Sequence, residues 1–161
     1  PEEALMAQTM SREVKIALLR NTAALADAFG REGTHNFLLP YWISFMNEPA
    51  WEVRAAYLEE AANLPQRVGQ VATEGLIWPC YEKALLDQEE RVVEAALRGL
   101  KVLVSQGGLR RTRLVPATKK VAPLLVHPSE LLRGSACEVV QAMSSQLSDL
   151  DQYVFLLPAV Q

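Results

Sequence analysis

Two histidines and two cysteines are the side chains in this sequence best suited to catalysis or metal binding. His35, His127, Cys80 and Cys137 could act as general bases, nucleophiles or zinc ligands if the fold brought them together. Their spacing argues against this, because the cysteines lie far apart and neither has a recognisable base nearby in the sequence. We predict two buried thiols in a reducing compartment and two structural or solvated histidines, with His127 in a turn.

Motifs for phosphate binding and protein kinase activity are absent from the sequence. It contains no His-Arg-Asp loop, no Asp-Phe-Gly, no Gly-rich loop opening a helix and no Gly-x-x-x-x-Gly-Lys-Ser/Thr. We therefore predict no catalytic residue, no cofactor-binding residue and no metal site in residues 1–161.

A basic run and a set of aromatic residues could instead bind partners. The basic run could contact an acidic protein surface or anionic lipid, although a solvated helix face is the favoured interpretation; it consists of Arg110, Arg111, Arg113, Lys119 and Lys120. The aromatic residues could line a partner groove, but at helical spacing they more often form the core; they are Tyr41, Trp42, Trp51, Tyr57, Trp78 and Tyr81.

Composition is that of a single domain. The chain has 161 residues, 50% of them apolar and 22% charged, so it can bury a sizeable core. Its net charge of -3 gives no argument for nucleic acid binding. No apolar run approaches the roughly 20 residues of a membrane-spanning helix. Because the chain starts at Pro1 without a methionine, we interpret it as part of a longer protein.

The elements that would position these residues follow from a repeated helical face. Val14, Val53, Val92 and Leu132 are anchors spaced 39, 39 and 40 residues apart. A small residue follows three positions after each anchor and a large apolar one eleven positions after it, which places all three on one side of a helix. The small residues are Ala17, Ala56, Ala95 and Ser135, and the large ones are Leu25, Leu64, Leu103 and Met143.

Four inner helices and their outer partners are expected from this repeat. The inner helices are predicted at 12–29, 51–64, 91–106 and 130–146, and the outer ones at 34–46, 74–86, 112–126 and 150–160. Ser11 is the expected first N-cap, and Gly30 and Gly107-Gly108 are expected to end helices. Pro40 and Pro79, each 13 residues before an anchor, predict a kink or a helix start. Two prolines, Pro116 and Pro123, predict a late start or a break in the outer helix at 112–126.

A period near 40 is typical of solenoids of paired helices. We predict an all-α, right-handed α-solenoid of about four helical hairpins with a period of 39–40. The expected units are residues 1–30, 31–69, 70–108 and 109–147, followed by a truncated unit at 148–161.

The sequence resembles HEAT repeats at two places in the same unit. Leu39-Pro40-Tyr41-Trp42 lies in the outer helix, and Val53-Arg54-Ala55-Ala56-Tyr57 follows with Leu64 further on. Val14-Lys15-Ile16-Ala17 and Leu132-Arg133-Gly134-Ser135 are variants of the second motif. Val92-Val93-Glu94-Ala95 lacks its basic residue.

A narrower resemblance is to the helical-repeat region of the protein-kinase-like regulatory subunit of the class III phosphatidylinositol 3-kinase. It is carried by the order of several pieces: Phe29-Gly30, Ile43-Ser44-Phe45-Met46-Asn47, the Trp51 turn, Leu86-Asp87, and His127-Pro128 followed by Leu132-Arg133.

This resemblance implies a parent with a kinase-like domain before the helices and a WD-repeat propeller after them. It implies a scaffold for the lipid kinase catalytic subunit and Beclin-type subunits in autophagy and endosomal sorting. The implied location is cytoplasmic, peripheral on endosomal and autophagic membranes through the parent complex.

Two alternatives remain. A generic HEAT-repeat interaction module of another cytosolic assembly would share the same architecture. A helical-repeat enzyme would need repeated His-Glu ligand pairs or a basic concave face, and neither is present in the sequence.

Overall fold

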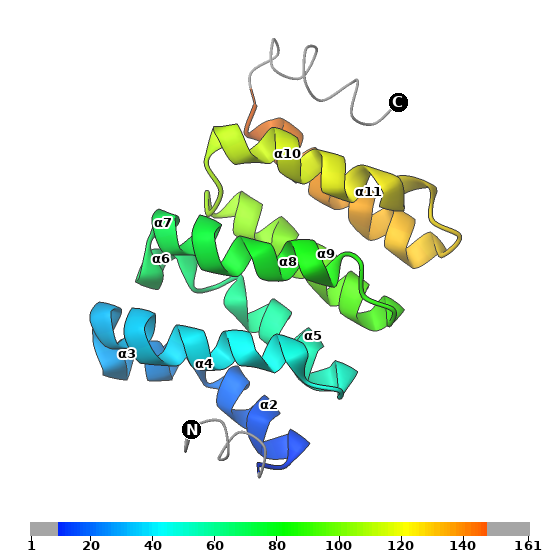
Figure 1. Ribbon diagram of the computed structural model, residues 1–161. Coiled ribbons are helices and arrows are strands. Elements are labelled where there is room, and N and C mark those ends of the chain that lie inside the picture. Colours follow the sequence, from blue (N-terminus) through cyan, green and yellow to red (C-terminus); the bar gives the residue numbers. More distant parts are fainter. Residues whose placement is uncertain (1–9, 148–161) are drawn as a thin grey trace.

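The computed structural model describes residues 10–147, which form two layers of helices (Figure 1). Inner helices α2 (Arg12–Arg20), α5 (Trp51–Ala61), α9 (Glu90–Ser105) and α11 (Glu130–Ser145) pack on one another in chain order. The outer helices α4 (Leu39–Ser44), α8 (Trp78–Ala84) and α10 (Arg111–Val121) form the second layer, and α8 and α10 pack against the inner helices that follow them in the chain. Residues 10–147 contain no β-strand, so the fold is the all-α solenoid that the repeat predicted.

The inner layer consists of α2 (Arg12–Arg20) with the part of α3 (Thr22–Gly33) before its kink at Gly30, α5 (Trp51–Ala61), α9 (Glu90–Ser105) and α11 (Glu130–Ser145). The last turn of α3, after Gly30, leads into the first outer helix. A short helix, α6 (Pro65–Val68), follows α5. The outer layer consists of three composite helices. They are η1 (Thr34–Leu38), α4 (Leu39–Ser44) and η2 (Phe45–Asn47); α7 (Gln70–Ala72), η3 (Thr73–Ile77) and α8 (Trp78–Ala84); and α10 (Arg111–Val121) with η4 (Ala122–Val126).

Several helix boundaries differ from those expected. The first inner helix is broken at Asn21, whose side-chain amide donates to the carbonyl of Ala17. The second inner helix ends at Ala61 rather than Leu64, and the outer helix expected at 74–86 begins at Gln70 rather than Glu74. A break in the outer helix expected at 112–126 is confirmed, because α10 gives way to the 3-10 turn η4 at Ala122, beside Pro123. The helix expected at 150–160 lies outside the described residues.

Glycines with left-handed backbone geometry precede all three outer helices. Gly30, Gly69 and Gly107 have φ angles of 70°, 85° and 72°. This region of φ is open to glycine and costly for other residues, so each glycine lets the chain leave one helix and begin the next. After α9 the N–H of Gly107 donates to Val104 and that of Gly108 to Leu103, the bonding pattern of a Schellman cap.

The outer prolines are accommodated by π-helical turns. The π-helix η1 ends just before Leu39-Pro40, and η3 ends just before Trp78-Pro79. The N–H of Leu39 donates to Thr34 and that of Trp78 to Thr73, each five residues back. A proline ring clashes with the carbonyl four residues earlier in an α-helix, and the wider turn relieves this clash. The expected helix starts near the prolines are confirmed.

The anchor residues are not all equivalent. Val53, Val92 and Leu132 are at most 1% exposed, whereas Val14 is 47% exposed. Within the described residues α2 lies at the end of the array and has an inner neighbour on one side only, α5. The side chains that α2 and α3 bury are therefore Lys15, Leu19, Thr22 and Ala26. The repeated helical face is therefore buried at Val53, Val92 and Leu132 but not at Val14.

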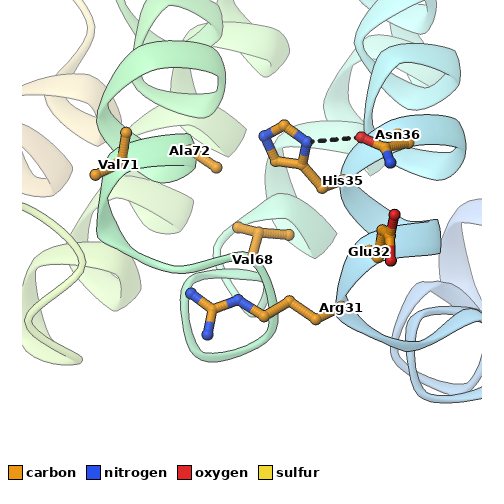
Figure 2. A pocket seen from close by; sticks show the side chains of 7 residues that line it. All are labelled: Arg31, Glu32, His35, Asn36, Val68, Val71 and Ala72. Atoms are coloured by element: carbon orange, nitrogen blue, oxygen red, sulfur yellow. Dashed lines mark hydrogen bonds between the residues drawn. The ribbon is translucent and has the colours of Figure 1, made fainter.

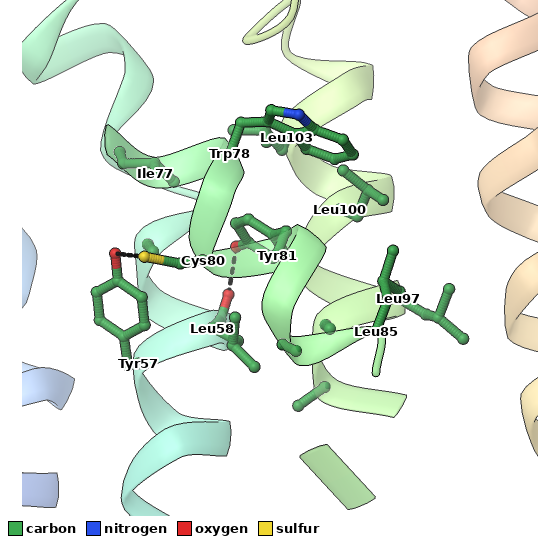
Figure 3. Packing of buried hydrophobic residues seen from close by; sticks show 14 of the residues in the cluster. Tyr57, Leu58, Ile77, Trp78, Cys80, Tyr81, Leu85, Leu97, Leu100 and Leu103 are labelled. Atoms are coloured by element: carbon green, nitrogen blue, oxygen red, sulfur yellow. Dashed lines mark hydrogen bonds between the residues drawn. The ribbon is translucent and has the colours of Figure 1, made fainter. Parts of the chain in front are cut away.

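The inner helices α5 and α9 approach each other closely at Gly99 in α9. A Cβ atom at this position would lie 2.5 Å from the Leu58 carbonyl oxygen in α5. The same carbonyl accepts a hydrogen bond from the buried Tyr81 hydroxyl of α8 (Figure 3). One backbone group thus joins three helices, and only glycine leaves room for it.

Candidate functional site

The histidines and cysteines lie on separate elements and form no shared site. His35 is on η1, Cys80 on α8, His127 in the turn before α11 and Cys137 on α11. His127 is in the predicted turn, where its Nδ1 pairs with the Ser129 N–H at 3.1 Å. No cluster of three potential metal ligands occurs among residues 10–147.

The two thiols differ in environment. Cys80 is buried as predicted, and burial raises the pKa of its thiol above the ordinary value despite the hydrogen bond from Tyr57 (Figure 3). A raised pKa disfavours the nucleophilic thiolate. Cys137 is exposed, so the prediction that it is buried is wrong. It directly follows the buried Ala136 on α11, and one residue turns a helical side chain through about 100°.

Most of the aromatic residues belong to the core. Trp42, Tyr57, Trp78 and Tyr81 are buried, which confirms the core interpretation for these four. Tyr41 and Trp51 are partly exposed. The guanidinium of Arg91 lies 4.8 Å from the Trp51 ring centre, a cation–π contact between α9 and α5.

Part of the basic run is used inside the fold. The Glu74 carboxylate, on η3, is buried and accepts hydrogen bonds from the Arg110 N–H at 2.7 Å and its guanidinium at 2.6 Å. Arg113 approaches the same carboxylate to 3.7 Å. Hydrogen bonding by Arg110 lowers the pKa of Glu74 below its ordinary value. Two members of the run therefore join neighbouring outer helices, while Lys119 and Lys120 are exposed on α10.

Ion pairs across the inner layer repeat at the spacing of the helices. Arg20 pairs with Glu59 at 2.9 Å, and Glu59 also pairs with Arg98 at 3.1 Å. Both pairs span 39 residues. Arg12 with Glu52, and Arg67 with Asp27, span 40 residues each. The charged side chains of neighbouring inner helices therefore neutralise one another.

A second series of contacts runs along the turns before the inner helices. The Arg54 guanidinium binds both oxygens of Asp87 and also donates to the carbonyls of Glu48 and Pro49. Burial alone raises the pKa of Asp87, but hydrogen bonds from Arg54 and the Glu89 N–H outweigh it and leave the pKa lowered.

The positions of this series recur in other units. Lys15 and Glu48 pair at 2.8 Å, again 33 residues apart. Arg133 donates to the carbonyls of His127 and Pro128, as Arg54 does to its own turn. Val93 occupies the equivalent position on α9, so this contact is missing there, as the sequence indicated.

An open groove between successive helix pairs is a further candidate site. It has a volume of about 390 Å³ and lies between α3–η1 on one side and α6–α7 on the other (Figure 2). We call it the outer groove; its lining residues are Arg31, Glu32, His35, Asn36, Val68, Val71 and Ala72.

The outer groove combines an apolar wall with a positioned cation. Val71 is 81% exposed, whereas Val68 and Ala72 are buried beside it. Arg31 extends beneath Val68, and its Nη2 lies 2.6 Å from where a Cβ of residue 69 would be (Figure 2). Gly69 thus makes room for this guanidinium. Sequence reasoning missed the groove. The available signal was Gly69, which follows Gly30 by 39 residues and shares its left-handed geometry in the structure.

Comparison with known proteins identifies relatives over nearly the whole chain. A family model described as "PIK3R4-like, middle domain" matches residues 3–161. The "Probable serine/threonine-protein kinase vps15" of Dictyostelium discoideum is 32% identical over 154 residues, which are 96% of this chain and 8% of that protein. The "Serine/threonine-protein kinase VPS15" of Arabidopsis thaliana is 31% identical over 159 residues, 99% of this chain and 11% of that protein.

A third relative, from Candida glabrata and named "non-specific serine/threonine protein kinase", is 29% identical over 147 residues, 91% of this chain and 10% of its own length. The chain therefore spans 8% to 11% of the length of these curated relatives.

Proposed function

This chain belongs to the PIK3R4-like middle-domain family, and on that premise we propose that it is a non-catalytic helical scaffold segment of a lipid kinase regulatory subunit. The segment links a kinase-like domain to a WD-repeat propeller. It organises the class III phosphatidylinositol 3-kinase catalytic subunit with Beclin-type subunits in autophagy and endosomal sorting. It reaches endosomal and autophagic membranes through the parent complex. Within residues 10–147, no helix is both long and apolar enough to span a bilayer.

The observation that carries the proposal is the ion pairing between successive helix pairs. Arg20, Glu59 and Arg98 connect three consecutive inner helices, and Arg54 with Asp87 connects two turns. Together with the buried packing of α2, α5, α9 and α11 on one another, these contacts fix the position of one helix pair against the next. A segment that keeps its length and shape can hold two flanking domains at a fixed separation. The division into units 1–30, 31–69, 70–108, 109–147 and 148–161 is part of this proposal.

A non-catalytic role is supported by the isolation of the candidate catalytic side chains. The two thiols and two imidazoles lie on different elements, and Cys80 is buried with a raised pKa. The outer groove holds no recognisable pair of nucleophile and base, since His35 pairs with Asn36.

The test replaces this segment in the full-length protein by a flexible Gly/Ser linker of equal residue number. We expect the flanking domains to fold, and the lipid kinase recovered by co-purification to fall at least about tenfold. Full recovery through the linker would contradict a spacer role. If the intact protein captures no lipid kinase but does capture another cytosolic assembly, the chain is a generic helical-repeat interaction module instead.

A further inference from the structure

We propose that the outer groove binds an amphipathic helix of a partner protein, which presents one carboxylate to Arg31 and an apolar side chain to Val71. This inference rests on the proposed scaffold function and names the partner chemistry of one of its surfaces. The groove lies between α3–η1 and α6–α7 (Figure 2). A third helix packs naturally into the furrow between two others and buries an apolar stripe there.

The apolar contact is supplied by the α6–α7 side of the groove. Val71 exposes 81% of its surface, and the buried Val68 and Ala72 flank it. An apolar side chain laid on this wall would remove the Val71 side chain from water, and this burial of apolar surface favours binding.

The electrostatic contact is supplied by Arg31. Its guanidinium is positioned by the space above Gly69, yet it forms no ion pair and no side-chain hydrogen bond with any residue between 10 and 147. The nearby Arg67 differs, because Asp27 neutralises it at 2.8 Å. An exposed guanidinium that has no anion among residues 10–147 is complementary to a carboxylate, which it can bind through two parallel hydrogen bonds.

The charges around the groove favour a protein over a membrane or a polyanion. Glu32 lines the groove beside Arg31 and would repel a second negative group. Binding to anionic lipid surfaces depends on clusters of several Lys or Arg residues, whereas the groove contains one Arg and one Glu. A helix with a single carboxylate offers Arg31 one negative group without bringing a second one near Glu32. The apolar stripe of the same helix covers Val71.

The first experiment measures binding of the 161-residue chain to a fluorescent helical peptide of Ala and Leu that carries one Glu. A twin peptide with Lys in place of Glu is the control ligand. We expect Arg31→Glu and Val71→Asp each to weaken binding of the Glu peptide at least about tenfold, and the Lys peptide to bind weakly to the unaltered chain.

Two matched variants serve as protein controls. Lys119→Glu reverses another exposed cation, and Phe37→Asp alters another exposed apolar residue that does not line the groove. Both should bind the Glu peptide like the unaltered chain. Circular dichroism checks that every variant stays helical. Equal binding of both peptides, or equal binding by Arg31→Glu and the unaltered chain, would overturn the proposal.

The second experiment separates this proposal from the scaffold function. The full-length protein carrying Arg31→Glu and Val71→Asp is tested for lipid kinase recovery and, by crosslinking mass spectrometry, for contacts at the groove. Loss of a crosslinked partner helix supports the proposal. If the variant keeps the same crosslinks at the groove and recovers lipid kinase normally, the groove is not a binding site for a partner helix, and the scaffold function stands. If the unaltered chain associates with itself and Arg31→Glu abolishes this association, a second copy of the chain occupies the groove. That result would refute binding of a partner helix.

Discussion

The Arg54 guanidinium binds the Asp87 carboxylate through two hydrogen bonds of 3.0 and 3.1 Å, although the two residues are 33 positions apart. Both side chains are 15% exposed. Because Arg54 also donates to the carbonyls of Glu48 and Pro49, it ties its own turn to the turn of the following helix pair.

Removal of Arg54 should destabilise the fold more than removal of a surface arginine. Arg54→Met leaves the Asp87 carboxylate and two carbonyls without this donor, and we expect the free energy of unfolding to fall by about 2–4 kcal/mol. Arg12→Met, which removes the exposed pairs with Glu52 and Glu13, should cost less than about 1 kcal/mol. Urea denaturation measures the free energy of unfolding of both variants. Equal losses would show that the contacts of Arg54 stabilise the fold no more than an exposed ion pair does.

Acidic pH should weaken the contact between η3 and the start of α10. The folded-state pKa of Glu74 lies below its ordinary value of 4.5, so its contribution to stability is present above that pH and is lost as pH falls through the lowered pKa. Glu74→Gln should therefore flatten the decline of stability below about pH 4.5. The measurement is thermal melting from pH 6 to about pH 3. An unchanged pH profile would show that the Glu74 pKa is the same in the folded and unfolded states.

Gly99 and Gly134 should respond oppositely to alanine. In Gly99→Ala the new methyl group would lie 2.5 Å from the Leu58 carbonyl oxygen, so we expect about 1–3 kcal/mol of destabilisation. Gly134, inside α11, has nothing within 4 Å of the equivalent position. Gly134→Ala should therefore stabilise by about 0.5–1 kcal/mol through helix propensity. Chemical denaturation measures the free energy of unfolding of both variants. If Gly99→Ala is stabilising, α5 and α9 lie further apart than in the structure.

Equivalent alanines at the centre and the end of the array should tolerate enlargement differently. Ala56 is 3% exposed, and Ala56→Leu should destabilise by about 1–3 kcal/mol because the added atoms overpack the space between helices. Ala17 occupies the same repeat position but is exposed. Ala17→Leu should change stability by less than about 0.5 kcal/mol. Similar melting temperatures for the two variants would contradict the difference in burial between them.

The sequence by itself determined the helices and their order. Apolar residues at helical spacing, the left-handed Gly30 and Gly107, and the prolines Pro40 and Pro79 act over one or two turns, so their effects are readable locally. The same local reasoning placed Val53, Val92 and Leu132 in the core.

Only the tertiary structure decided which side chains meet. Glu74 reaches Arg110, and Arg31 lies over Gly69, because successive helix pairs stack with a particular offset and angle that no local pattern encodes. Val14 fits the same sequence pattern as Val53 and yet is exposed, since burial depends on neighbours on both sides of a helix. Local sterics fix the conformation of each helix, whereas the packing between helices fixes the contacts from which a binding surface is made.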